Sequence, residues 1–391
     1  MPLLEDEHTG SRIREQRRLA RLTQRELADR IPYSLSLLNQ VECGARPATP
    51  GFVAAVAHAL RVDSSKLTGP PAETALIADR LLALVAPIRE ALDRFDLGPN
   101  PDLVRVRPAS DLIAEADALC QQVRATHLRA AAKALPALIV ELTHTVWTAP
   151  STAAWRALAS AYRTAHDVAL KLDYPDLARV ALDRMGWAAG RASDPCIEAV
   201  QRYKRATLWR CATSAPLIAS GHALLAGQTN REALAVTGQL HLGLATVAAK
   251  AEDATAVETH LGAARELAER VGGEAGDVHW LSFGRVNVRL HELGTAITMS
   301  NFDEALGRAR TIKLPESTLT SRRARYLVDR ALVEMEAGSA KSSLKFLSEA
   351  RKVSPEQTRH LPGTRATIRR LVHMSRRAPD SLGGMARWVG M

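Results

Sequence analysis

Apolar residues near the start of the chain recur at the spacing of two short helices separated by a turn. Leu27 and Ile31 lie four positions apart, on one face of the first helix. Thr23 and Glu26 have the T-x-x-E spacing of a capping box, in which each side chain accepts a backbone amide hydrogen bond. Pro32 has no amide proton and ends the helix. The pattern predicts a helix that begins near residue 24.

The second helix is predicted to begin after Ser34, because serine is a favoured N-cap residue. At 100° per residue, Leu37, Leu38 and Val41 turn inward and form its core face. Its outward face consists of Leu35, Ser36, Asn39, Gln40 and Cys43. Serine, asparagine and glutamine can hydrogen-bond base edges in the major groove, and leucine can contact a thymine methyl group. This outward face is suited to reading DNA.

Two more helices flank this pair. Thr49 and Pro50 suit the N-cap and the first position of a helix that carries the apolar stripe of "FVAAVAHAL". Upstream, "SRIREQRRLARL" is typical of a basic amphipathic helix. Its arginines cannot all be buried, so we expect some of them, including Arg17, to face DNA phosphates.

Residues 9–69 together resemble the lambda-repressor-like (Xre-type) helix-turn-helix family. Besides the "FVAAVAHAL" helix, the matching residues are Leu22, Thr23, Gln24, Glu26, Leu27, Ala28, Ser34, Leu38, Val41, Glu42, Gly44 and Pro47. The resemblance implies five short helices, with the recognition helix starting from Ser34. Pro32 departs from the pattern, since many members carry a glycine with positive φ there, which proline cannot adopt.

The resemblance also implies roles for single residues. It assigns base contacts to Leu35, Ser36 and Gln40, a phosphate contact to Gln24, and a place in the loop that grips the DNA backbone to Arg46. With Asn39 added from the helix plot, the residues predicted to contact DNA are Arg17, Gln24, Ser34, Leu35, Ser36, Asn39, Gln40 and Arg46. The alternative is a helix-turn-helix retained only for protein contacts.

Beyond Pro71 the chain is typical of successive helices divided by proline and glycine, with no convincing period-2 strand. Ser343, Leu347, Ala350 and Pro355 follow the second-helix spacing of a tetratricopeptide repeat. Small residues at such positions let paired helices stack closely. We predict an all-α fold, in which a five-helix head precedes an α-solenoid of about five or six degenerate tetratricopeptide-like helix pairs. A generic helical bundle is the alternative.

The predicted division of the chain has five parts. They are a flexible N-terminus (1–8), the helix-turn-helix domain (9–69), a connecting helix and linker (70–110), the repeats (111–375) and a basic C-terminal tail (376–391). On segments such as "YPDLARVALDRMGWAAGRASDP" and "YLVDRALVEMEAGSAKSSLKFLSEARKVSPEQTRHLP", the whole chain resembles actinobacterial regulators that join an Xre-type head to a tetratricopeptide-like body. That resemblance implies a body that dimerises or senses a ligand.

One candidate ligand site lies in "FGRVNVRLHELGTAI". Asn287 and His291 form an i, i+4 pair beside its apolar stripe, and Arg285 and Arg289 form another. Asn287 could hold a peptide amide, and Arg289 a carboxylate. The alternative is a solvated or intramolecular polar row.

A second candidate ligand site gathers aromatic and cationic residues in a chain that has few aromatics. It consists of Trp187, Tyr203, Trp209 and Arg210. These residues could line a pocket, or they could fill the gaps that alanines leave between helices.

Composition narrows the possible functions. The 391 residues carry a formal charge of +10, with the basic excess concentrated in 351–391, a pattern more typical of a solvated face than of a binding arm. The four cysteines form no C-x-x-C pair, so we expect neither a zinc site nor a disulfide framework. Neither H-E-x-x-H nor G-x-x-x-x-G-K-[ST] occurs, so we expect no enzyme activity and no cofactor. The apolar runs are too short to cross a bilayer.

These observations favour a cytoplasmic, homodimeric regulator that associates with the nucleoid when it binds a double-stranded DNA operator, and whose body senses a peptide or small-molecule effector. The alternative is a tetratricopeptide scaffold that docks proteins in its helical groove and whose helix-turn-helix does not read DNA.

Overall fold

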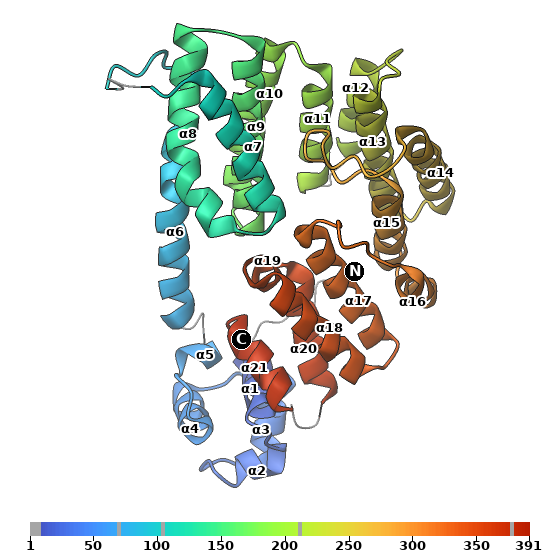
Figure 1. Ribbon diagram of the computed structural model, residues 1–391. Coiled ribbons are helices and arrows are strands. Elements are labelled where there is room, and N and C mark those ends of the chain that lie inside the picture. The colour runs from blue at the N-terminus through green and yellow to red at the C-terminus, as the bar shows by residue number, and fades with distance from the viewer. Residues whose placement is uncertain (1–8, 69–71, 103–105, 210–212, 376–378) are drawn as a thin grey trace.

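The computed structural model describes residues 9–68, 72–102, 106–209, 213–375 and 379–391, and within these ranges all regular structure is helical. The first five helices form the head (Figure 1). They are α1 (Thr9–Leu19), α2 (Gln24–Ala28), α3 (Leu35–Glu42), α4 (Pro50–Leu60) and α5 (Ser65–Thr68). Ile13, Leu27, Leu38, Phe52 and Val56 fill their common core. The all-α prediction and the five-helix head are confirmed.

α6 (Ala72–Asp93) leads from the head into a larger helical body (Figure 1). The body contains α7 (Ala109–Arg124), α8 (Leu128–Thr148), α9 (Thr152–Lys171), α10 (Pro175–Ala192), α11 (Pro195–Trp209), α12 (Ser214–Leu224), α13 (Arg231–Lys250), α14 (Ala254–Val271), α15 (Arg285–Thr298), α16 (Phe302–Thr311), α17 (Thr320–Glu336), α18 (Ala340–Val353), α19 (Pro355–His360), α20 (Pro362–Met374) and α21 (Asp380–Trp388). Helices adjacent in sequence pack in pairs, most extensively α9 with α10, α13 with α14 and α17 with α18. Buried alanines such as Ala161 and Ala181 allow these close approaches. The arrangement is compatible with a solenoid.

The last helices of the body return to its first ones. Arg129, at the start of α8, donates its backbone N–H to Glu356 Oε2 of α19 at 3.1 Å. Lys171, at the end of α9, donates its Nζ to Gln357 Oε1 of α19. α17 also packs against α7. The C-terminal helices α17 and α19 therefore contact α7, α8 and α9 near the start of the body.

The expectation of a solvated basic tail over residues 376–391 is wrong for residues 380–391. These residues contain α21, and Leu382, Met385, Ala386 and Val389 are buried in a core shared with α17, α18 and α20. The helix is amphipathic, and it carries only one basic residue, Arg387, beside one acidic residue, Asp380. Its short apolar stripe was not distinguished in the sequence because the segment was grouped with the more basic residues that precede it. No helix in the part of the chain that the structure describes is long and apolar enough to span a membrane.

Gly238 of α13 should tolerate no side chain. A Cβ atom there would lie 2.0 Å from Cζ of Phe283, whose ring is fully buried. We expect Gly238→Ala to lower the free energy of unfolding by about 1–3 kcal/mol, because the ring has no space into which it can move. Thermal unfolding followed by circular dichroism would test this.

Gly262→Ala on the neighbouring helix α14 is the matched control for Gly238→Ala. Nothing lies within 4 Å of a Cβ atom at Gly262, so alanine should be neutral or slightly stabilising there. Equal melting temperatures for the two variants would contradict the prediction.

Candidate nucleic-acid interface and polar sites of the body

The recognition helix α3 presents the outward face that its periodicity predicts. Leu38 and Val41 are buried, and Leu37 is partly buried. Leu35 is 44% exposed, so its side chain is available for an apolar contact at this face. The other exposed residues at this face are Ser34, Ser36, Asn39, Gln40 and Cys43. The orientation of the helix is confirmed, and contact of these residues with DNA stays a prediction.

Local hydrogen bonds determine where α2 and α3 begin. Thr23 Oγ1 accepts the backbone N–H of Glu26 at 3.2 Å, and Glu26 Oε2 accepts the backbone N–H of Thr23 at 2.6 Å. Ser34 Oγ accepts the backbone N–H of Leu37 at 3.2 Å. Both caps were predicted, and Pro32 lies in the exposed turn between the two helices. The caps therefore fix the ends of the helix-turn-helix.

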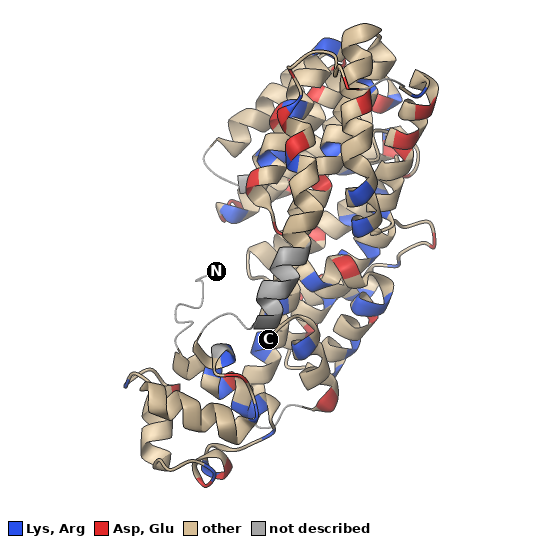
Figure 2. Ribbon diagram, turned by 90° about the vertical axis from the view of Figure 1, so that its left-hand side faces the viewer, with Lys and Arg blue, Asp and Glu red and all other residues tan. Residues whose placement is uncertain are grey.

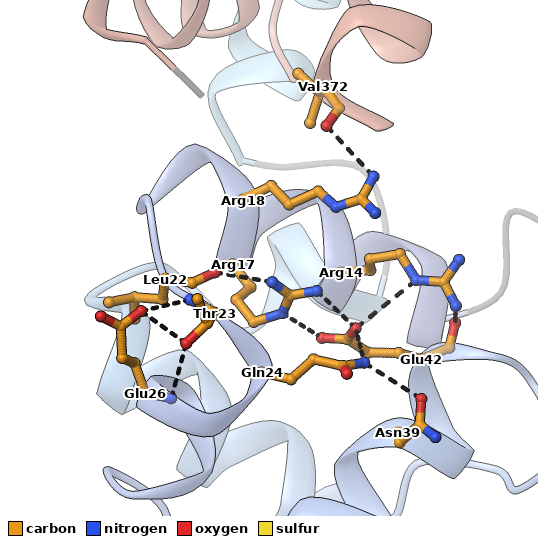
Figure 3. Close-up of polar contacts among 10 residues, drawn as sticks. All are labelled: Arg14, Arg17, Arg18, Leu22, Thr23, Gln24, Glu26, Asn39, Glu42 and Val372. Carbon is orange, nitrogen blue, oxygen red and sulfur yellow. Dashed lines mark hydrogen bonds and ion pairs between the residues drawn. The ribbon is translucent and has the colours of Figure 1, made fainter. Parts of the chain in front are cut away.

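A buried carboxylate holds α1, α2 and α3 together (Figure 3). Glu42, at the end of α3, is 1% exposed. Its carboxylate accepts Arg17 Nε at 2.7 Å, Arg17 Nη2 at 2.9 Å and Gln24 Nε2 at 2.9 Å. Arg14 Nε lies 3.7 Å from the same carboxylate. One anion on α3 thus orients side chains of α1 and α2.

The expectation that Arg17 faces phosphates is wrong. Arg17 is 5% exposed, and its Nη1 donates to the carbonyl oxygen of Leu22 at 2.8 Å while the rest of the guanidinium pairs with Glu42. A buried arginine requires such a complete set of acceptors, and Glu42 supplies the charge. The partner lies 25 positions away and was not recognised in the sequence.

Gln24 and Arg46 lie at the edges of the recognition face. Gln24 Nε2 donates to Asn39 Oδ1 at 3.3 Å as well as to Glu42, so the start of α2 is tied to the exposed side of α3 (Figure 3). Arg46 is exposed in the loop after α3, and its backbone N–H donates to the carbonyl oxygen of Gln40 at 3.1 Å. Both remain placed where a DNA backbone could reach them.

The back of the head rests on the C-terminal helices. Arg18 Nη1 donates to the carbonyl oxygen of Val372 at 3.3 Å and also to that of His373, both on α20. Arg21 pairs with Asp380 at the start of α21. Arg18 and Arg21 therefore contact the C-terminal helices, although the sequence alone would also have allowed them to face DNA. Because the outward face of α3 stays exposed in the whole chain, docking orients the head without covering that face.

The two predicted ligand sites meet in one buried chain of amides. Asn287 is 2% exposed, and its Nδ2 donates to Gln239 Oε1 at 3.2 Å. Gln239 Nε2 donates to the hydroxyl of Tyr203 at 2.9 Å. Gln239 was missed, because a glutamine within an apolar helix carries no motif. Asn287 Oδ1 has no hydrogen-bond partner among the described residues, and the residue Asn287 helps to line a cavity of about 260 Å³.

The other residues of the first predicted site do not share the environment of Asn287. Arg285 is exposed and pairs with Glu269, and Arg289 is exposed as well. His291 is partly buried. Two positions correspond to about 200° of rotation on a helix, so Arg289 and Asn287 point in nearly opposite directions. The residue expected to bind a carboxylate, Arg289, is therefore separated from the residue expected to bind an amide, Asn287.

The second predicted site is also divided. Trp187 packs against Phe95 and Trp155, with ring centroids 5.1 and 5.2 Å away, and the guanidinium of Arg191 lies 4.1 Å from its ring centroid. This aromatic cluster favours the gap-filling interpretation of Trp187. Arg210 and the side chain of Trp209 lie outside the described residues.

A buried group of charges lies where α7, α9 and α11 meet. Asp167 accepts Arg124 Nη2 at 2.8 Å and Lys204 Nζ at 2.5 Å. Burial alone would raise the pKa of Asp167, but the charges of Lys204 and Arg124 hold that pKa well below its usual range. Burial and the nearby Arg124 also lower the pKa of Lys171 to about 7. This group has no signature in the sequence, because its members lie far apart in the chain.

One mixed group of side chains has the chemistry of metal ligands. Donor atoms of Asp194, Cys196, Glu232 and His279 all lie within 4.8 Å of one another. Asp194 is already engaged, since its Oδ1 accepts the backbone N–H of Cys196 at 3.0 Å and its Oδ2 lies 2.8 Å from Arg156 Nε. The expectation of no metal site stays untested.

The view of the body in Figure 2 shows no separation of positive from negative charge. Figure 2 shows basic and acidic residues interspersed along its helices. Net charge therefore does not locate a nucleic-acid interface, and the local chemistry of α3 carries more weight.

Two comparisons with known proteins found a match. Residues 9–67 match the family model described as "Helix-turn-helix domain". A propionyl-CoA carboxylase regulator of Cereibacter sphaeroides is 38% identical over 81 residues, which are 21% of this chain and only 17% of that protein. No solved structure matches the chain. The tetratricopeptide character of the body and the actinobacterial origin stay predictions, and residues 9–67 are a helix-turn-helix domain.

Proposed function

We propose that this protein is a sequence-specific DNA-binding transcription regulator, whose body forms a homodimer and binds a peptide or small-molecule effector. The observation that carries the proposal is the exposed face of α3, where Leu35, Ser36, Asn39 and Gln40 point outward from a helix fixed by caps and by Glu42. The name of the Cereibacter relative, a regulator, supports the same class.

Replacing Gln40 with alanine should weaken binding at one base pair of the operator by about 1–3 kcal/mol, because a glutamine side chain can make paired hydrogen bonds to an adenine edge. Operators would first be selected from random duplexes with the full-length protein. Fluorescence anisotropy of the selected duplex and of its single-base variants then measures the loss.

Gln121→Ala, an exposed glutamine on α7, is the matched control for Gln40→Ala and should bind like the unaltered protein. Affinity should also fall steeply with salt, since phosphate contacts release counterions. DNA binding that is absent or insensitive to salt would contradict the proposal.

Dimerisation is inferred from the small size of the head. One such module buries too little surface for tight, selective binding, and two modules on half-sites about one helical turn apart overcome this. Sedimentation equilibrium of the full chain should give twice the chain mass of 42.4 kDa. A monomer, both free and on DNA, would refute the homodimer.

A further inference from the structure

A cavity of about 720 Å³ lies between α7, α9, α10, α11, the start of α13 and the segment 272–284, which crosses from α14 to α15. Its size falls in the range of pockets that hold small molecules, about 300–1,000 Å³. Much of its wall is apolar. The apolar lining includes Ile113, Ala116, Ala157, Met185, Ile197 and Val200. The cavity can therefore hold an apolar molecule of substantial size.

Arg163 of α9 contributes a cation to this apolar wall. It is 3% exposed, and its buried Nε has no hydrogen-bond partner among the described residues. Arg124 and Asp167 are among the charged groups that act on it. Both oxygens of Asp167 are already bonded, to Arg124 and to Lys204, so that carboxylate does not serve Arg163 alone. A buried guanidinium without its own anion is costly, which points to an anion that arrives with a ligand.

The other charged residues that line the cavity have partners. His279 Nε2 lies 2.5 Å from Glu232 Oε1, and Asp117 Oδ1 accepts Trp280 Nε1 at 3.3 Å. Arg231 Nη2 donates to Asp277 Oδ1 at 3.0 Å, and Arg156 Nε lies 2.8 Å from Asp194 Oδ2. One available guanidinium beside an apolar wall suits a singly charged, planar carboxylate, which an arginine can bind with two parallel hydrogen bonds. A phosphate dianion would need more unpaired donors than Arg163 supplies.

We propose that this cavity binds an organic carboxylate with an apolar body and that Arg163 pairs with its carboxylate. The proposal rests on the effector binding proposed above, and it places the effector site at Arg163 rather than at Asn287. Two sources share this chemistry, namely free aliphatic acids and the carboxyl terminus of a short apolar peptide.

The test is calorimetric titration of the full-length protein with octanoate and with octanamide, its neutral counterpart. A second pair of probes is an apolar tetrapeptide with a free carboxyl terminus and the same peptide with a C-terminal amide. At least one acid should bind about 10- to 100-fold more tightly than its amide, the range expected for hydrogen bonds to a charged group. Binding of octanoate would indicate a free aliphatic acid as the natural ligand, and binding of the tetrapeptide acid would indicate a peptide carboxyl terminus. Trp280 lies at the cavity wall, so ligand binding should also change tryptophan fluorescence.

Arg163→Gln should remove the preference for the acid over the amide while the protein stays folded by circular dichroism. Arg179→Gln, an exposed arginine on α10, is the matched control and should keep the preference. If Arg163→Gln does not fold, the comparison of acid and amide on the unaltered protein still decides. Equal binding of acid and amide, or no binding by either acid, overturns the proposal. Because no DNA is present, failure of DNA binding would leave this result unaffected.

Discussion

Replacing Glu42 with glutamine is expected to lower the free energy of unfolding of the head by about 3–5 kcal/mol, the cost of breaking a buried ion pair from one side. Glutamine keeps the shape of the side chain and removes its charge. Arg17 would then be a buried cation with no anion. The NH₂ group of the glutamine side chain would also place a hydrogen-bond donor opposite the N–H donors of Arg17 or Gln24. Since these contacts join α1, α2 and α3, the loss should extend over the whole head.

Hydrogen exchange of the full-length protein, followed by mass spectrometry, would measure this locally. Peptides from residues 9–60 should exchange faster in Glu42→Gln, whereas those from the body should change little. Asp29→Asn removes an exposed carboxylate of the same domain and is the matched control. Equal protection of the head in the two variants would show that the charge of Glu42 does not hold the helices together.

The predicted features of the head depend on neighbours in sequence. Thr23 and Ser34 cap helices through residues three positions away, and the outward position of Gln40 follows from helical periodicity. The assignment of Arg17 to DNA failed because its burial depends on Glu42, across the fold. An arginine on a basic helix has the same local pattern whether its partner is a phosphate or a buried carboxylate.

In the body, sequence patterns predicted the helices but not their polar contacts. Asn287 and Tyr203 were singled out as members of two separate sites, and the structure connects them through Gln239, a residue without any motif. Arg163 was not singled out either. Its significance follows from a cavity formed by several helices and segment 272–284, and such a cavity has no signature in sequence spacing.

The second large effect is expected for Asp167→Asn, which should lower the free energy of unfolding of the body by about 3–5 kcal/mol at pH 7. Asp167 is the carboxylate that Arg124 and Lys204 share, so asparagine would leave two inward cations uncompensated. Urea denaturation followed by helical circular dichroism would measure the loss. Asp176→Asn, an exposed residue on α10, is the control.

The effect of Asp167→Asn should depend on pH in a defined direction. The pKa of Asp167 in the folded protein lies well below its ordinary value of 3.8, so the folded state binds its proton less readily than the unfolded state does. The stabilisation by this carboxylate is therefore complete above about pH 4 and is lost as the pH falls through the folded-state pKa. The difference between the unaltered protein and Asp167→Asn should therefore shrink as the pH falls from about 4 further into acid. If the difference in unfolding free energy between the two proteins grew in acid, the folded state would favour protonation of Asp167. The ion pairs with Arg124 and Lys204 would then not account for the stability of this part of the body.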